Sequence, residues 1–183
     1  MHVGFVGVGA MGAAMAGHVA KGGHNVRVFD LDTEAMTKAA MTPGVTAAAG
    51  MEDIAACDTV IIVVATDTQS RAVVSDLLDR GAKGVLVVAG TNHPRTMIEL
   101  AETCTKRGAR FVDAPVCYGL KGAIDGDLVS LCGGSAEDVA AVEPVLACYS
   151  RAVEHLGPVG CGQLGKTCNN MTPRADPPAK YRV

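Results

Sequence analysis

The sequence has few aromatic residues and no surplus of positive charge. Its 183 residues include no Trp, three Tyr and three Phe, and the formal net charge is -3. Proteins that bind nucleic-acid phosphates carry excess Lys and Arg, and single-strand binders stack bases on aromatic rings. We therefore expect no nucleic-acid partner.

The sequence also lacks an apolar run long enough to cross a bilayer, which takes about 20 residues. Its most apolar run, TVIIVVAT (59–66), is far shorter. The first residues, MHVGFVGVGAMG, show neither the basic leader nor the small-residue cleavage site of a signal peptide. We expect no membrane partner and a cytoplasmic location; a mitochondrial matrix protein without a visible transit peptide is the alternative.

The seven cysteines contain no closely spaced pair. A structural zinc site usually needs two such pairs, so we expect no metal site. Without a secretory signal, the simplest interpretation is reduced thiols that are mostly buried as small apolar residues. The cysteines are at positions 57, 104, 117, 132, 148, 161 and 168.

Short β-branched runs alternate with Ala-rich amphipathic segments. Runs that are apolar on both faces, each followed by a helix, indicate a parallel sheet covered on both sides. Right-handed crossovers then give a doubly wound, mostly parallel α/β sheet. The expected strands are 2–8, 25–30, 45–48, 59–66, 83–90, 109–116, 128–134 and 151–157, and the expected helices are 10–22, 33–41, 68–81, 93–108 and 135–149.

A glycine motif, Gly7-x-Gly9-x-x-Gly12, directly follows the first expected strand and opens the first helix. The first glycine permits a tight turn, the second lets the backbone approach a pyrophosphate, and the third lets helix and strand pack closely. Ala10 and Met11 begin the helix, whose N–H groups and dipole favour phosphate. The motif predicts a dinucleotide-binding, Rossmann-type domain; the alternative is a glycine-rich turn that binds nothing.

Asp30 ends the second expected strand, 18 positions beyond Gly12. A carboxylate there accepts hydrogen bonds from ribose hydroxyls and repels a 2′-phosphate. No Arg follows it, because the next residues are Leu31 and Asp32. We therefore predict NAD as the cofactor and NADP as the less favoured one.

Two threonines follow later strands, at the edge where cofactors bind in such sheets. Thr66 follows the fourth strand, and Thr91 lies with Asn92 in the loop that we place beside the nicotinamide ribose. We predict both threonines to be cofactor-binding. His93 is interpreted as a helix-start residue rather than a catalyst.

Four segments together resemble the β-hydroxyacid dehydrogenases, the family typified by 3-hydroxyisobutyrate dehydrogenase. They are FVGVGAMG, Asp30, DAPVCYGLKGAIDGDL (113–128) and GPVGCGQLGKTCNNM (157–171). The resemblance implies an NAD(P)-dependent oxidoreductase. Its reaction would transfer hydride between NAD and the 3-hydroxyl carbon of a small 3-hydroxy acid.

The resemblance also implies how the substrate carboxylate is held. In the family, a loop after DAPV, usually Ser-Gly-Gly, holds it through a hydroxyl and backbone N–H groups. The three positions here are Cys117, Tyr118 and Gly119. A thiol is a weaker donor than a hydroxyl, so this difference bears on the particular substrate more than on the reaction class.

The segment GKTCNN resembles the family's K-x-x-N-N motif, which contains the catalytic residue. The resemblance implies that Lys166 is the acid–base group, that Asn170 hydrogen-bonds the substrate and that Asn169 supports the site. Lys166 and Asn170 are four residues apart, which places them on one helix face.

The sequence is expected to divide into a dinucleotide-binding domain (1–157), the start of the catalytic inter-domain helix (158–171) and a disordered tail (172–183) with three prolines. Members of the resembled family continue into an all-helical domain that closes the substrate cleft and forms the dimer. We expect a truncated chain that lacks this domain and its oligomer interface, with NAD binding retained and turnover weak or lost.

Two alternatives stay open. One is a non-catalytic NAD-binding module, and the other is a 6-phosphogluconate dehydrogenase-like protein. The second is less favoured because the substrate phosphate calls for basic residues that the visible loop does not obviously supply.

Overall fold

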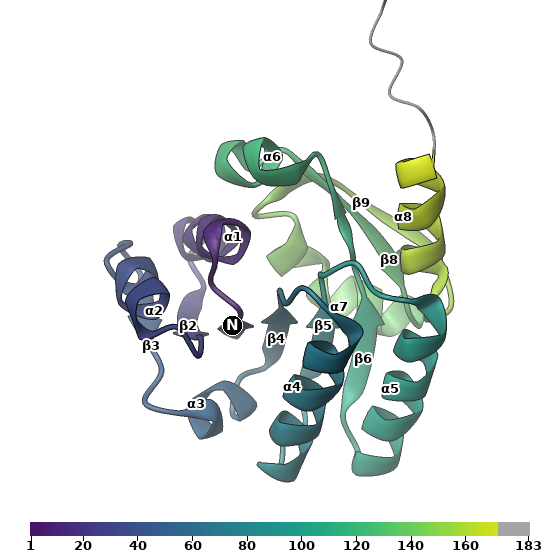
Figure 1. Cartoon of the computed structure of the whole chain (residues 1–183), viewed down its shortest axis with the longest axis horizontal. Coiled ribbons are helices and arrows are strands. Elements are labelled where there is room, and N and C mark those ends of the chain that lie inside the picture. Colours follow the sequence, from purple (N-terminus) through teal and green to yellow (C-terminus); the bar gives the residue numbers. More distant parts are fainter. Residues whose placement is uncertain (172–183) are drawn as a thin grey trace, which may run out of the picture.

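The computed structural model describes residues 1–171, and within them the strands form a single sheet (Figure 1). The strands are β1 (His2–Val6), β2 (Asn25–Phe29), β3 (Val45–Ala47), β4 (Thr59–Ile62), β5 (Val85–Val88), β6 (Arg110–Asp113), β7 (Val116–Cys117), β8 (Leu128–Gly133) and β9 (Ser150–Gly157). Their order is β3-β2-β1-β4-β5-β6-β8-β7, with β9 also paired to β8.

The first six strands pair in parallel, from β3 at the edge to β6. β8 runs antiparallel to β6 and β7, and β9 runs parallel to β8. This arrangement confirms the predicted doubly wound, mostly parallel sheet. The expected single strand over 109–116 is wrong: it divides into β6 and β7 at Ala114-Pro115, because proline has no N–H with which to extend a strand ladder.

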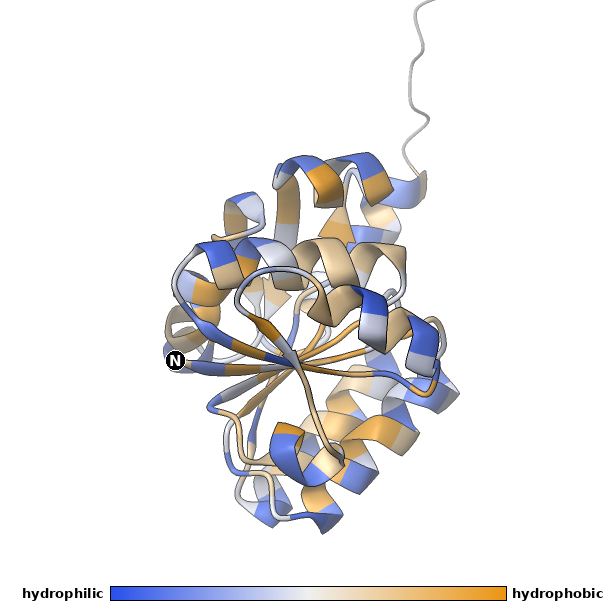
Figure 2. Cartoon of the chain, turned by 90° about the vertical axis from the view of Figure 1, so that its left-hand side faces the viewer, coloured by the Kyte–Doolittle hydropathy of each residue, from blue (hydrophilic) through white to orange (hydrophobic). Residues whose placement is uncertain are grey.

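Helices cover both faces of the sheet. They are α1 (Ala10–Lys21), α2 (Thr33–Ala40), α3 (Met51–Ala55), α4 (Asp67–Asp79), α5 (Pro94–Arg107), α6 (Gly119–Asp125), α7 (Ala136–Leu146) and α8 (Cys161–Met171). One core cluster joins the sheet to α1 and α7, and a second joins it to α3, α4 and α5. In Figure 2 the strands are mainly apolar, whereas the helices alternate apolar and polar residues.

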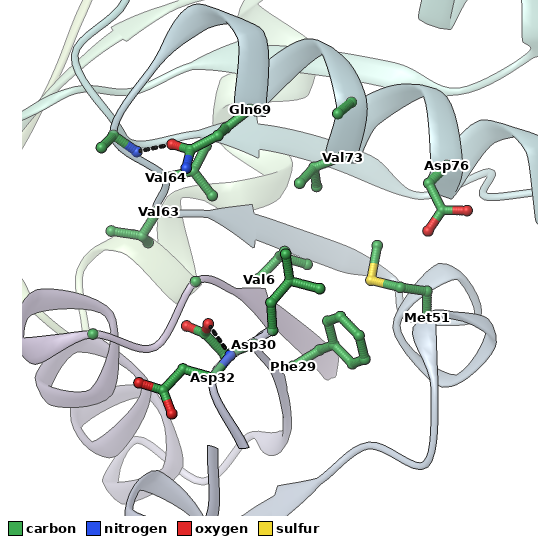
Figure 3. Close-up of a pocket in the computed structure, with 15 residues that line it drawn as sticks. Val6, Phe29, Asp30, Asp32, Met51, Val63, Val64, Gln69, Val73 and Asp76 are labelled. Atoms are coloured by element: carbon green, nitrogen blue, oxygen red, sulfur yellow. Dashed lines mark hydrogen bonds between the residues drawn. The ribbon is translucent and has the colours of Figure 1, made fainter. Parts of the chain in front are cut away.

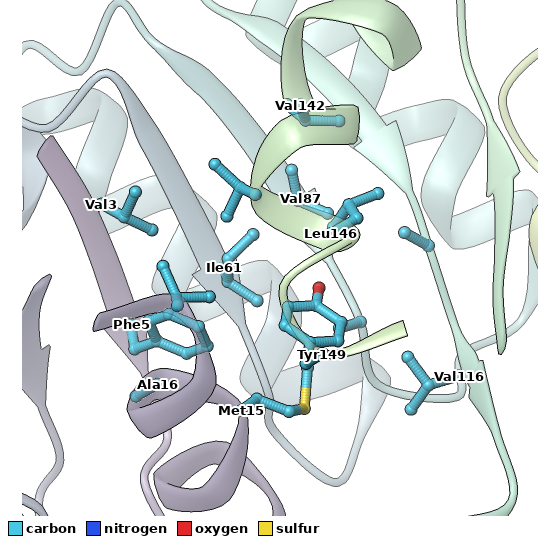
Figure 4. Packing of buried hydrophobic residues seen from close by; sticks show 14 of the residues in the cluster. Val3, Phe5, Met15, Ala16, Ile61, Val87, Val116, Val142, Leu146 and Tyr149 are labelled. Carbon is cyan, nitrogen blue, oxygen red and sulfur yellow. The ribbon is translucent and has the colours of Figure 1, made fainter. Parts of the chain in front are cut away.

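Large side chains fill the first core cluster. Phe5 of β1 and Ile61 of β4 project from the sheet toward Met15 of α1 and Leu146 of α7 (Figure 4). Tyr149, which follows α7, is fully buried in the same cluster. Burial of such side chains stabilises each by roughly 1.5–3 kcal/mol relative to exposure. The core therefore fixes the sheet against α1, whose first turn carries the glycine motif.

Two helices, α3 and α6, were not among those expected. The resemblance predicts a loop at 117–119, the point from which α6 continues. Its sequence, GLKGAID, has two glycines in seven residues, which lowers intrinsic helix propensity. The helix nevertheless begins after Tyr118 (φ 84°) and ends at Gly126 (φ 70°), both in the left-handed region. His18 of α1 supports it by a hydrogen bond between Nε2 and the Ile124 carbonyl (3.0 Å).

The helix α8 lies within the segment 158–171, where the start of an inter-domain helix is predicted; the predicted disorder of 172–183 lies outside the described residues. Over residues 1–171, no helix is both long and apolar enough to cross a membrane.

Candidate functional site

The three motif glycines meet different surroundings. A Cβ at Gly7 (φ 89°) would lie 2.3 Å from the Val63 carbonyl oxygen, and one at Gly12 would lie 2.0 Å from the Gly7 oxygen. These two positions therefore require glycine for the fold itself. A Cβ at Gly9 would meet nothing within 4 Å. Gly9 thus faces open space, as the position nearest a pyrophosphate should.

The start of α1 is suited to an anion. Gly9 is its N-cap and offers no side-chain hydrogen bond to the first N–H groups, which belong to Ala10 and Met11 among others. The first turn also has no acidic residue that would repel a phosphate. Backbone N–H groups and the helix dipole can therefore act together on a bound pyrophosphate.

The Asp30 carboxylate is held beside the glycine loop by two backbone groups. Val8 N–H donates to Oδ2 (2.7 Å), and Asp32 N–H donates to Oδ1 (3.0 Å). Each carboxylate oxygen can accept two hydrogen bonds, so each can still accept one from a ribose hydroxyl. Asp32 itself caps α2, and Arg27 pairs with Asp53 at 3.2 Å.

A cavity of about 640 Å³ lies at the carboxyl ends of β1, β2 and β4, beside the glycine loop (Figure 3). Its wall is mostly apolar, its charged lining groups are carboxylates, and among the described residues no Lys or Arg lines it. This chemistry suits an adenosine with free ribose hydroxyls. The lining residues are Val6, Gly7, Gly9, Phe29, Asp30, Leu31, Asp32, Met51, Val63, Val64, Ala65, Gln69, Ala72, Val73 and Asp76.

The two predicted threonines lie near this edge in different roles. Thr66 is the N-cap of α4, and its side chain accepts a hydrogen bond from Gln69 N–H (3.2 Å). Thr91 is exposed in the loop between β5 and α5. His93 caps α5, which confirms its interpretation as a helix-start residue. Contact of either threonine with a cofactor stays a prediction.

The fold brings Lys166 to the predicted substrate loop. Its Nζ donates to the Val116 carbonyl oxygen (2.8 Å) and lies 3.9 Å from Cys117 Sγ. Cys117 is buried. Asn169 and Asn170 are exposed near the end of α8, the helix that carries Lys166. The structure therefore places the predicted acid–base residue against the first residue of the predicted carboxylate-binding loop.

Tyr118 and Gly119 start α6 with two consecutive left-handed residues (φ 84° and 61°). The Tyr118 ring lies over the guanidinium of Arg151 on β9, with 4.3 Å from Cζ to the ring centroid. A Cβ at Gly119 would meet nothing within 4 Å, so its backbone is open to an approaching group. A substrate role for either residue stays a prediction.

Two buried residues that sequence reasoning missed hold α8 in place. The Asp113 carboxylate accepts hydrogen bonds from Gly160 N–H (2.7 Å) and Gln163 N–H (2.8 Å) at the start of the helix. The Gln163 side chain accepts from Asn92 N–H and donates to the Gly90 carbonyl oxygen, both at 2.9 Å. Burial raises the pKa of the Asp113 carboxyl, and the hydrogen bonds from backbone N–H groups oppose this effect.

A weak signal for these two residues was present in the sequence. Asp113 directly follows an apolar run at the end of a strand, and Gln163 lies in a helix start rich in glycine. Neither pattern indicates which groups the side chain hydrogen-bonds, because each is a backbone group far away in the chain.

Comparison with known proteins decides the family. The sequence profile described as the NAD binding domain of 6-phosphogluconate dehydrogenase matches residues 2–157. The chain belongs to this family. The fold, the glycine loop and the position of Asp30 are those expected of a dinucleotide-binding domain, and the resemblance to the β-hydroxyacid dehydrogenases is confirmed by the relatives.

The relatives include 3-hydroxyisobutyrate dehydrogenases. The mitochondrial enzyme of Drosophila melanogaster is 34% identical over 173 residues, which cover 93% of this chain and 53% of that protein. An NAD-dependent L-serine dehydrogenase of Pseudomonas aeruginosa is 33% identical, over 92% of this chain and 58% of that protein.

A solved structure of Mycobacterium tuberculosis 3-hydroxyisobutyrate dehydrogenase with L-serine has a TM-score of 0.89 and 32% identity, covering 93% of this chain and 59% of that one. The chain therefore spans a little over half the length of these relatives.

Proposed function

We propose that this chain binds NAD at the carboxyl edge of its sheet and takes part in the oxidation of a small 3-hydroxy acid. The observation that carries the proposal is the position of Lys166, whose Nζ is fixed at 2.8 Å from the Val116 carbonyl oxygen beside the predicted carboxylate-binding loop. The glycine loop and Asp30 lie at the ends of other strands on the same edge. A dinucleotide site and an amine thus share one edge.

The choice of NAD over NADP rests on Asp30 and on the acidic, apolar cavity around it. A 2′-phosphate would approach a carboxylate that two backbone N–H groups hold in place. Asp30→Arg is therefore expected to raise the affinity for NADP relative to NAD, measured by titrating both. Asp76→Asn is the matched control, because it removes a charge from another wall of the cavity. An unchanged ratio in Asp30→Arg would contradict the assignment.

In the proposed reaction, bound NAD supplies the hydride acceptor. Lys166 takes the proton of the substrate 3-hydroxyl at Nζ, and the Val116 carbonyl orients that amine. The open backbone at Gly119 accommodates the substrate carboxylate. Asp113 and Gln163 hold the start of α8, which keeps Lys166 beside the loop that begins at Cys117.

The substrate class follows from what this arrangement can recognise. The site needs a carboxylate for the loop that begins at Cys117 and a hydroxyl on the 3-carbon within reach of Lys166. L-Serine and 3-hydroxyisobutyrate, the compounds named for the relatives, share this chemistry. We therefore propose a short acid with a free carboxylate and a 3-hydroxyl group.

Formation of NADH from NAD tests the proposal, with 3-hydroxyisobutyrate, L-serine and related acids as substrates. Lys166→Arg is the matched variant, because guanidinium keeps the positive charge but does not release its proton. Because the chain is expected to turn over weakly if at all, we expect at most slow NADH formation by the unchanged chain and none in Lys166→Arg, with NAD affinity preserved in both. Equal rates in both proteins would overturn the role of Lys166. Binding of NAD with no turnover in either protein would favour a non-catalytic module.

A further inference from the structure

Lys166 has a nucleophilic neighbour that the proposed reaction does not use as a nucleophile. Cys117 Sγ lies 3.9 Å from Lys166 Nζ, although the two residues are 49 positions apart in the chain. The Val116 carbonyl holds the amine on this side of α8. Asp113 and Gln163 fix the helix from its first turn. The pair is therefore a consequence of the fold and of well-defined contacts.

Three other cysteines are deeply buried, and within residues 1–171 none of them has a hydrogen bond with a lysine amine. Burial raises the pKa of Cys57 to about 11 and the pKa values of Cys104 and Cys132 to about 12. These three thiols stay protonated near neutral pH, and the protonated form is a poor nucleophile. What distinguishes Cys117 is its position, because its sulfur accepts a hydrogen bond from the Lys166 amine. Oxidation in the buried part of the chain should consequently favour Cys117.

We propose that Cys117 and Lys166 form a peroxide-driven, thiol-reversible covalent bond between sulfur and nitrogen. Hydrogen peroxide first oxidises the thiol to a sulfenic acid, taking up two electrons and leaving one water. The Nζ lone pair of the neutral amine then attacks the sulfur, the S–O bond breaks, and the hydroxyl leaves as water with an amine proton. In sum, a thiol, an amine and one peroxide give a sulfenamide and two waters.

The geometry favours condensation over further oxidation of the sulfenic acid. The Lys166 amine already lies 3.9 Å from the sulfur, whereas a second peroxide must first diffuse to a residue that is only 5% exposed, so condensation competes well with further oxidation. Rotation of the flexible lysine side chain closes the remaining distance at the expense of its hydrogen bond to Val116. The bond withdraws Nζ from proton transfer, a consequence that rests on the proposed function; the bond itself does not.

Peptide mass spectrometry tests the bond without any assay of activity. The intact chain is treated with hydrogen peroxide, digested without reductant and compared with a sample reduced by dithiothreitol. We expect a linked pair of peptides, carrying Cys117 and Lys166, whose mass is the sum of the two less two hydrogens. Dithiothreitol is expected to release both peptides. Dimedone, which traps sulfenic acids, is expected to label Cys117 and to reduce the yield of the linked pair.

Three variants serve as controls, each checked for folding by circular dichroism. Cys117→Ser and Lys166→Arg are expected to abolish the linked pair. Cys168→Ser, which removes an exposed thiol of the same helix, is expected to leave it unchanged. Persistence of the pair in Cys117→Ser would overturn the proposal, as would a linked pair that retains an oxygen.

Oxidation of Cys117 to a sulfinic acid with Lys166 unmodified would also overturn it. Because the readout is a peptide mass, failure of this bond is distinct from failure of the proposed dehydrogenase reaction, which the NADH measurement reports.

Discussion

The backbone N–H of Gln163 donates to the Asp113 carboxylate at 2.8 Å, which joins the start of α8 to the end of β6. The same carboxylate accepts the N–H of Gly160 at 2.7 Å. Helix starts leave N–H groups without partners, and a buried start needs an acceptor from elsewhere. Asp113 supplies that acceptor, and Lys166 follows one turn after Gln163. The position of the proposed acid–base group thus depends on a residue that need not touch the substrate.

Replacement of the Asp113 carboxylate by an amide is expected to destabilise the fold. In Asp113→Asn, one side-chain oxygen is replaced by an amide N–H₂, which cannot accept a backbone N–H. A buried donor left without a partner costs about 1–3 kcal/mol, and we expect a loss in the free energy of unfolding of that size. Urea denaturation measures it. Asp127→Asn, which breaks an exposed pair with Arg151, should cost less than about 1 kcal/mol; equal losses would contradict the account.

The pH dependence of stability gives a second test of Asp113. Burial raises its pKa in the folded protein, whereas an unfolded Asp titrates near about 3.9. Between these two values the folded protein holds a proton that the unfolded chain has lost. Asp113 therefore lowers the free energy of unfolding as pH rises through this window.

Asp113→Asn removes this titration. The stability difference between the unchanged chain and the variant should thus be greatest at acidic pH and decrease as pH rises. Urea denaturation at a series of pH values measures the difference. A difference that grows with rising pH would show that the pKa shift has the opposite sign.

Substitutions at two of the motif glycines should differ in their effect on stability. Gly12→Ala places a Cβ 2.0 Å from a backbone oxygen, and we expect it to cost about 3 kcal/mol of stability. Gly9→Ala meets nothing within 4 Å and should cost less than about 1 kcal/mol, since it changes only the N-cap. Thermal or urea unfolding of the two variants gives the comparison. Equal losses would mean that the two glycines do not differ as described.

At position 118, a glycine variant should be more stable than an alanine variant, which is the reverse of the usual order in a helix. The Tyr118 φ of 84° is unfavourable for any residue with a Cβ, by roughly 1–2 kcal/mol. Both Tyr118→Ala and Tyr118→Gly lose the contact with Arg151, but only glycine removes the strain. We expect Tyr118→Gly to be more stable than Tyr118→Ala by about 1 kcal/mol in urea denaturation.

The matched control for Tyr118 is Leu120, an exposed position in α6. There the alanine variant should be the more stable of the two by about 1 kcal/mol. The same order at both positions would contradict the proposed strain at Tyr118.

Much of the fold could be predicted because its elements have local causes. β-Branched runs and amphipathic segments indicate their own secondary structure, and α7 begins after a serine, Ser135, whose hydroxyl accepts a hydrogen bond from Asp138 N–H (3.0 Å). The division at Pro115 also has a local cause, which the apolar pattern of 109–116 concealed. The helix α6 could not be predicted in this way, because it depends on packing against α1, which overrides weak local propensity.

The residues of the candidate site that belong to short sequence motifs could be predicted. Gly7, Gly9, Gly12 and Asp30 act through backbone geometry and charge at positions close in sequence or fixed by the first two strands. The contacts of Asp113, Gln163 and Cys117 with their partners join positions about 50 to 70 residues apart. Only the folded sheet brings such groups together.

Calorimetric titration with NAD tests most directly the claim that the carboxyl edge of this sheet is a dinucleotide site. The unchanged chain and Gly9→Ala are compared, since this substitution fills the open position at the glycine loop without a clash inside the protein. We predict one NAD bound per chain and a clear loss of affinity in Gly9→Ala, with both proteins folded. Absence of binding to the unchanged chain, or equal affinity in the two proteins, would contradict the claim.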